Sequence, residues 1–197
     1  ASSLNNIGIT YKKLDSLNLA LDYFNQSLAI KNAFSDKMLI TSTLANIGDI
    51  FFINHDYKNA EIKYLESYRL KKEINDQNGI IFVANKLGEL YLRTGLLDKA
   101  KIFLEDGLDI ARRINSNELA MNNLKLQAQL YERQRQPGKA LETYKIYDTL
   151  KNRIFDSEKA KVISELRIKY ETEKNESEIK TLNAIRNSQD SQIKAQT

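Results

Sequence analysis

The chain has 197 residues, of which 42% are hydrophobic and 28% are charged, a balance typical of a folded protein. The net charge of +4 is spread along the chain without a basic arm or stripe, so we expect no nucleic acid as a partner. Cysteine is absent, which excludes disulfides and thiolate chemistry. No apolar run reaches the roughly 18 residues that a membrane-spanning helix needs.

Four columns of similar residues repeat along the chain at an offset of 40 residues. The columns are Gly8, Gly48, Gly88 and Ala128; Tyr11, Phe51, Tyr91 and Tyr131; Ala20, Ala60, Ala100 and Ala140; and Phe24, Tyr64, Leu104 and Tyr144. Four columns that keep one register across four copies indicate a repeat architecture.

Each copy reads as two helices. Tyr11 follows Ile7 by four residues and Phe24 follows Ala20 by four, so each pair shares one helical face. Turn signals divide the copies at Asp15-Ser16, His55-Asp56, Thr94-Gly95 and Gln136-Pro137-Gly138, and Pro137 suits the first turn of a helix. Between copies, Ser35, Asp76 and Ser116 are predicted N-caps. The pattern predicts four helical hairpins in residues 1–150, with approximate copies 1–34, 35–75, 76–115 and 116–155.

The repeated glycines are predicted to be packing residues. Glycine inside a helix costs about 1 kcal/mol relative to alanine. Repeated use of glycine at this cost indicates that a neighbouring helix must approach closely. Ala128, in the fourth copy, is the next smallest residue and fits the same explanation.

Residues 156–197 are predicted to form one long helix that begins near Ser157. Val162, Ile163, Leu166 and Tyr170 form an apolar stripe that suits a cap over the last repeat. Beyond Glu171 the apolar residues thin out, and a lone helix of this composition is marginal in water. The heptad pattern of this helix is imperfect, so a homodimer formed through a coiled coil is a hypothesis.

Residues 1–150 resemble the tetratricopeptide repeat, in which small, aromatic, alanine and aromatic positions follow in this order. The resemblance implies an all-α, right-handed superhelix of four hairpins followed by the long C-terminal helix. The unit here has 40 residues, against the usual 34, and Asn32, Lys72, Arg112 and Asn152 stand where a proline often closes the unit. The longer unit is similar to repeats of the kinesin light chain and LGN type and to those of many bacterial signalling proteins.

The sequence offers little for catalysis. His55 is the single histidine and lies in a polar turn, where an exposed surface role is expected. One histidine and no cysteine leave no tight zinc site, and the glycines are too far apart for a phosphate-binding loop. We expect no catalytic residue, no metal and no cofactor.

The candidate site is the concave surface, which the first helix of each hairpin lines in this fold. Asparagine and glutamine can pair with the backbone of an extended peptide while apolar neighbours take its side chains. The predicted peptide-binding residues are Asn6, Asn46, Asp49, Phe52, Asn85, Glu89, Leu92, Arg93, Lys125 and Gln129. The carboxylate clamp of chaperone-binding members is not reproduced, and Asp49 and Glu89 are expected to repel a peptide's terminal carboxylate.

Residues 165–182 resemble the connecting helix that follows such repeats in bacterial membrane sensor kinases and regulators. Because the chain begins at Ala1 and ends within a helical run, we expect a segment of a longer protein without its output domain. The leading interpretation is a peptide-binding or partner-binding sensory or scaffolding segment that makes no membrane contact itself, on the extracytoplasmic side in preference to the cytoplasm. A free-standing soluble adaptor and the peptide-sensing part of a transcription regulator remain alternatives.

Overall fold

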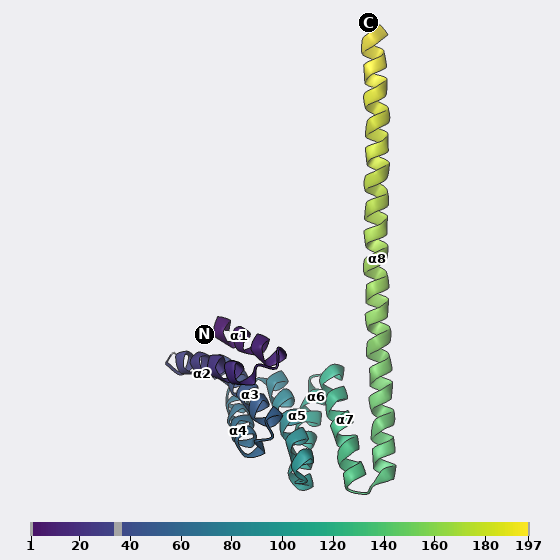
Figure 1. The fold of residues 1–197 in the computed structure, drawn as a ribbon. Helices are drawn as coiled ribbons and strands as arrows, with labels where there is room; N and C mark the ends of the chain where they lie inside the picture. The colour runs from purple at the N-terminus through teal and green to yellow at the C-terminus, as the bar shows by residue number, and fades with distance from the viewer. Residues whose placement is uncertain (1, 34–36, 197) are drawn as a thin grey trace. The chain divides into compact units, whose positions relative to one another are not determined.

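A computed structural model describes residues 2–33 and 37–196, and all of their regular structure is α-helical. Eight helices follow in chain order (Figure 1). They are α1 (Ser2–Lys13), α2 (Leu17–Ala33), α3 (Lys37–Ile53), α4 (Tyr57–Glu73), α5 (Gln77–Thr94), α6 (Leu97–Arg113), α7 (Asn117–Arg133) and α8 (Pro137–Gln196). The helices α1 to α7 and the start of α8 form four antiparallel hairpins that wind into a right-handed solenoid, as predicted.

The connections between helices use one recurring backbone conformation. A residue with positive φ follows the helix end in six of the described turns, at intervals of 20 residues or multiples of 20. These residues are Asp15, His55, Asn75, Gly95, Asn115 and Arg135. After each, a backbone N–H returns to a carbonyl of the last helical turn, as Asp56 N donates to Phe51 O at 2.9 Å. This left-handed termination reverses the chain tightly enough for the next helix to pack back.

The predicted N-caps at Asp76 and Ser116 precede α5 and α7, and Pro137 is the first residue of α8. The Asp76 side chain accepts a hydrogen bond from Gly79 N at 2.9 Å, whereas Ser116 makes no side-chain cap bond. The third predicted N-cap, Ser35, and the predicted boundary between residues 34 and 35 lie outside the described residues. The repeat boundaries drawn from the sequence stay a prediction.

The predicted role of the repeated glycines in packing is confirmed. A Cβ atom at Gly8 would lie 2.6 Å from the Phe24 ring, and one at Gly88 would lie 2.4 Å from Leu104. Each contact joins the two helices of one hairpin, across the same interval of 16 residues. The alanine column is fully covered as well, because Ala20, Ala60 and Ala100 are 0% exposed.

The largest core cluster runs through the middle repeats and positions the inner helices. Tyr64, Leu87, Tyr91 and Leu104 pack together there with other buried residues from α3 to α7. A smaller cluster around Phe24 joins α2 and α3, and another around Ile81 joins α5, α6 and α7. Because every repeat contributes to a cluster shared with its neighbour, the inner faces of successive hairpins are held in a fixed register.

The predicted helix start near Ser157 is wrong. Helix α8 is continuous from Pro137, so it contains both the second helix of the fourth hairpin and the C-terminal extension. Neither glycine nor proline occurs after Gly138, and the residues between are mostly good helix formers, so nothing ends the helix before Ser157.

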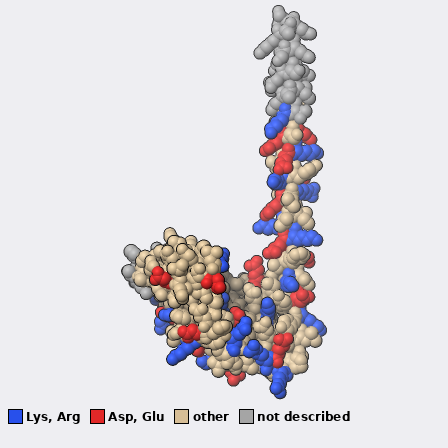
Figure 2. All heavy atoms as spheres, viewed as in Figure 1, with Lys and Arg blue, Asp and Glu red and all other residues tan. Residues whose placement is uncertain are grey.

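The chain divides into two compact units, Ala1–Lys151 and Asn152–Thr197. In the described part of the second unit, the side chains of the predicted stripe, Val162, Ile163, Leu166 and Tyr170, are exposed. Lys, Arg, Asp and Glu alternate along this helix (Figure 2), and ion pairs join residues four apart, such as Arg167 and Glu171 at 3.2 Å. None of the described helices has both the length and the apolar character that a membrane span requires.

Candidate functional site

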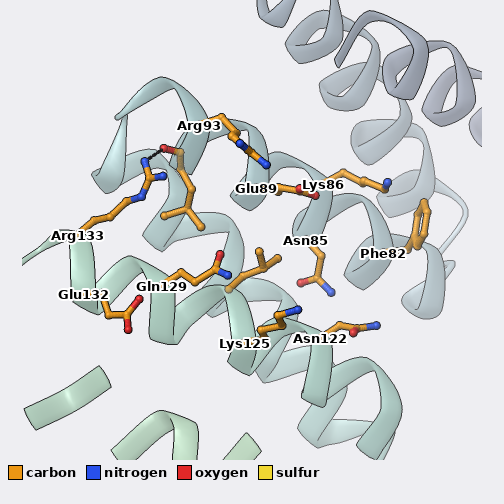
Figure 3. Close-up of a pocket in the computed structure, with 12 residues that line it drawn as sticks. Phe82, Asn85, Lys86, Glu89, Arg93, Asn122, Lys125, Gln129, Glu132 and Arg133 are labelled. Carbon is orange, nitrogen blue, oxygen red and sulfur yellow. Dashed lines mark hydrogen bonds between the residues drawn. The ribbon is translucent and has the colours of Figure 1, made fainter. Parts of the chain in front are cut away.

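A groove of about 720 Å³ lies between α5 and α7, the first helices of the third and fourth hairpins (Figure 3). Six residues of each helix line it, at positions that differ by 40. Phe82, Asn85, Lys86, Glu89, Leu92 and Arg93 come from α5, and Asn122, Lys125, Leu126, Gln129, Glu132 and Arg133 come from α7. We call this surface the α5–α7 groove.

Helical spacing places these six positions on one face. They follow one another at intervals of three or one residues, which is the spacing of a single helical stripe. The opposite faces of both helices are buried, with Leu87 and Leu90 on α5 and Leu124 and Ala128 on α7. Core packing on one side therefore fixes which side chains α5 and α7 present to the groove.

The groove combines amide, charged and apolar groups. Asn123, which is buried on α7, donates from Nδ2 to Asn85 Oδ1 at 2.8 Å and so ties the two walls together. Arg133 donates to the backbone carbonyl of Leu92, a second bond between the walls (Figure 3). The half-exposed Phe82 ring lies under the ammonium of Lys86, 5.5 Å from Nζ to the ring centroid.

A buried polar cluster lies beside the groove and joins α1, α3, α4 and α5. The Asp49 carboxylate pairs with Lys12 Nζ at 2.8 Å and Lys86 Nζ at 3.0 Å, and it accepts a hydrogen bond from the Tyr64 hydroxyl at 2.7 Å. Burial alone would raise the pKa of Asp49, but Lys86, Lys12 and the hydrogen bonds together lower it below the ordinary value. Burial and the Asp49 carboxylate raise the pKa of Tyr64, so its hydroxyl stays a donor.

The face between α1 and α3 is bridged by the chain's own side chains. Lys12 Nζ donates to Asn46 Oδ1 at 3.3 Å, and Asn5 Oδ1 accepts from Thr43 Oγ1 at 3.0 Å and from Asn46 Nδ2 at 3.4 Å. These bonds occupy the polar groups that would otherwise face a ligand. The concave face is thus bridged internally between α1 and α3 and hollowed between α5 and α7.

Comparison with known families decides what this solenoid is. The sequence profile of the tetratricopeptide repeat matches residues 39–113, and a second profile of the same description matches residues 1–34. Together the two matches cover more than half of the 197 residues. The chain belongs to the tetratricopeptide repeat family. Tetratricopeptide repeats form a non-catalytic protein-interaction module, and the chain is therefore a protein-binding module.

Solved tetratricopeptide structures share the fold. The apo form of RapI superposes with a TM-score of 0.73 at 16% identity, over 80% of this chain and 57% of RapI. A signal transduction ATPase from Pyrococcus horikoshii, described as having a tetratricopeptide repeat sensor, gives 0.71 at 18% identity, over 80% of this chain and 24% of that protein. The Rap conjugation gene regulator of plasmid pLS20, in complex with the Phr* peptide, gives 0.67 at 12% identity, over 78% of this chain and 42% of the regulator.

At these identities the likeness concerns the fold alone. The chain spans less than two thirds of the length of each of these three proteins. Comparison with the sequences of curated proteins gives no match.

Six of the ten residues predicted from the tetratricopeptide pattern line the α5–α7 groove. They are Asn85, Glu89, Leu92, Arg93, Lys125 and Gln129. The Leu92 side chain is buried, and this residue presents its carbonyl to Arg133. The assignment of these residues to peptide binding stays a prediction.

The other four predicted residues lie outside the groove. Asn46 and Asp49 belong to the polar bridges between helices, and Phe52 packs against the core and meets the Tyr57 ring edge to face at 5.6 Å between centroids. Asn6 is exposed on α1, where its carbonyl accepts from Thr10 Oγ1 at 3.0 Å. Asp49, which the sequence predicts to repel a peptide's terminal carboxylate, is paired with two lysines.

The sequence interpretation missed half of the groove lining. The missed residues are Phe82, Lys86, Asn122, Leu126, Glu132 and Arg133. A signal for four of them was available, because adding 40 to Leu92 and Arg93 gives Glu132 and Arg133, and adding 40 and 80 to Asn46 gives Lys86 and Leu126.

His55 lies in the turn after α3, where its Nδ1 is 3.0 Å from the Tyr57 hydroxyl and the side chain is exposed. Among the side chains that the structure describes, no group of three or more His, Asp or Glu is arranged to hold a metal ion.

Proposed function

We propose that the α5–α7 groove binds an extended peptide segment, supplied by a free peptide or by a partner protein. The observation that carries the proposal is the pair of matched rows of six residues that face one another across an open groove. Each row offers an amide side chain near its middle, Asn85 on one wall and Gln129 on the other, with apolar surface from Phe82 and Leu126 beside them. Amides satisfy a peptide backbone, and the apolar surface takes its side chains.

The length of the groove sets the length of the ligand. Arg93 follows Phe82 by eleven positions, which corresponds to about 16 Å along a helix axis. An extended chain rises about 3.3 Å per residue. The groove therefore accommodates about five extended residues, which is a short linear segment and not a folded domain.

We further propose that this segment serves as the sensory or scaffolding part of a bacterial signalling protein. The solved complex of a Rap regulator with the Phr* peptide supports a peptide ligand in this fold, and the ATPase with a tetratricopeptide repeat sensor supports a sensory role. In this proposal, occupation of the groove changes the packing of α7 against the start of α8. Helix α8, which is continuous beyond the last repeat, then transmits that change to an output module.

A homodimer through the second unit is the proposed means of such transmission. Phe155, Val162, Leu166 and Tyr170 share one helical face and are each more than half exposed. Sedimentation of the unaltered chain and of a Val162→Glu, Leu166→Glu variant would test it, since a dimer is expected only for the unaltered chain. Identical monomers would remove this part of the proposal.

A peptide-binding experiment tests the groove itself. Fluorescence anisotropy with a library of labelled pentapeptides would be run on the unaltered chain and on an Asn122→Ala, Gln129→Ala variant. In the described structure neither side chain hydrogen-bonds to another residue, so the variant removes ligand contacts without opening the fold. Two lost hydrogen bonds should weaken binding at least about fivefold.

An Asn6→Ala, Asn18→Ala variant is the matched control, because it removes two exposed amides from outside the groove. It should bind as tightly as the unaltered chain. Equal affinity of all three proteins, or no bound peptide at all, would contradict the proposed function.

A further inference from the structure

The polar cluster at Asp49 shows how a carboxylate on the concave face of this chain is neutralised. Three donors hold that carboxylate: the ammonium groups of Lys12 and Lys86 and the hydroxyl of Tyr64. Lys12 comes from α1 in the first hairpin, Lys86 from α5 in the third, and Tyr64 from α4 in the hairpin that carries Asp49. The negative charge of this partly buried carboxylate is therefore balanced by two ammonium groups and one hydroxyl donor of the chain itself.

One repeat later a carboxylate occupies the position equivalent to Asp49, but the residues equivalent to its three donors cannot donate. Glu89 occupies the position of Asp49, shifted by 40 residues, on α5. The same shift replaces Lys12 by Phe52, Lys86 by Leu126 and Tyr64 by Leu104. All three replacements are apolar, so none can donate a hydrogen bond or a positive charge to Glu89.

The structure agrees with this register argument. Glu89 is half-buried in the middle of the α5–α7 groove, and its carboxylate makes no hydrogen bond or ion pair with any of the described residues (Figure 3). The nearby Lys86 ammonium is already paired with Asp49 at 3.0 Å. A half-buried carboxylate without a partner is unfavourable, and an incoming cation relieves that cost.

We propose that Glu89 receives a positively charged group of the bound peptide and so selects peptides that carry one at their centre or amino terminus. This inference rests on the proposed function and gives it a ligand class. The group is a lysine or arginine side chain or the α-ammonium, and a guanidinium or ammonium at Glu89 takes the place that Lys12 and Lys86 have at Asp49.

Matched pentapeptides test the proposal. One set carries lysine or arginine at each position in turn with an acetylated amino terminus, a second carries the neutral isostere norleucine or citrulline, and a third is neutral with a free amino terminus. On the unaltered chain, one cationic set should bind about tenfold tighter than the neutral acetylated set, as expected for a charge-assisted hydrogen bond. The set that shows the gain identifies the source of the positive charge.

Two variants locate that preference. Glu89→Gln should abolish the tenfold difference, whereas Glu132→Gln, which changes the other carboxylate of the groove, should retain it. A cationic preference that survives Glu89→Gln, or its absence from the unaltered chain while groove binding persists, would overturn this inference and leave the proposed function standing. If no peptide binds, both fall.

Leu126→Lys adds a test based on the 40-residue repeat. It supplies Glu89 with the lysine that Asp49 has in Lys86, shifted by 40 residues. The chain's own ammonium should then exclude the positive group of the peptide, so the tenfold advantage of the cationic set over the neutral acetylated set should disappear on this variant. Persistence of that advantage would count against the assignment of Glu89.

Discussion

The aromatic ring of Tyr64 lies directly against the backbone of Gly48. A methyl carbon on Gly48 would be 2.6 Å from both Cδ1 and Cε1 of that ring. The ring has no room to yield, because the Tyr64 side chain is 1% exposed and its hydroxyl is held by Asp49 at 2.7 Å. The missing side chain at Gly48 is therefore what allows α3 and α4 to approach each other.

We predict that Gly48→Ala destabilises the solenoid by about 1–3 kcal/mol, the range for overpacking a core. The effect runs against helix propensity, which alone would favour alanine by about 1 kcal/mol. Thermal unfolding followed by circular dichroism measures it. Gly138→Ala is the control, because a Cβ atom there meets no atom within 4 Å, so the unfolding midpoint should not fall. A Gly48→Ala protein as stable as the unaltered chain would contradict the packing account.

The packing of each hairpin could be predicted from sequence because it depends on residues at fixed offsets. The column of Gly8 and the column of Phe24 lie 16 residues apart in every copy, and the contacts of Gly8 with Phe24 and Gly48 with Tyr64 confirm that these columns pack together. The continuity of α8 was not predicted, although neither glycine nor proline occurs between Gly138 and Ser157 to end the helix. Ser157 lies within the helix instead.

Replacement of Asp49 should change how stability depends on pH. Its pKa is lowered in the folded chain, so its stabilising effect is complete above the unfolded value of about 3.9 and is lost as the pH falls through the folded pKa. At neutral pH, Asp49→Asn should cost about 2–4 kcal/mol, because Lys12 and Lys86 lose their partner. The difference in unfolding midpoint between the two proteins should therefore shrink from pH 5 to pH 2. A constant difference over that range would show that Asp49 does not titrate as described.

Two aspartates at helix starts allow a paired comparison. Asp76 caps α5 and also pairs with Lys71 Nζ at 2.8 Å, and the Lys71 side chain is 7% exposed. Asp76→Ala should cost about 2–3 kcal/mol, since it removes a cap and leaves a buried ammonium unpaired. Asp56→Ala removes only the cap of α4, where the Asp56 carboxylate accepts from Asn59 N, and should cost less. Equal losses in denaturant unfolding would mean that the Lys71 pair contributes nothing.

The turn residues offer a stabilising change. Arg135 has φ of +57°, a conformation that strains a side chain, while Gly95 holds the equivalent turn at +77°. Arg135→Gly should stabilise the chain by about 0.5–1 kcal/mol, as left-handed helix ends favour glycine. Gly95→Ala is the reciprocal change and should lower the unfolding midpoint. If both substitutions shift the midpoint in the same direction, the turn account is wrong.

The candidate site was harder to predict than the fold. From the helical period the sequence predicts Asn85, Glu89 and Gln129 on the concave face, and the three residues line one groove. It does not reveal directly that Lys12 crosses to Asp49 and bridges the face between α1 and α3. That bridge depends on the reach of one side chain across two hairpins, which the periodicity of a single helix does not encode.

Cross-linking tests the central claim, that the α5–α7 groove holds the peptide, most directly. The chain contains no cysteine, so Asn122→Cys in the groove and Ile102→Cys on α6, whose native Ile102 is 63% exposed, each give one attachment point for a photoreactive benzophenone. We expect the tightest-binding pentapeptide to cross-link from position 122 and to be displaced by unlabelled peptide, with little product from position 102. Equal or stronger cross-linking from position 102 would place the peptide elsewhere and contradict the account.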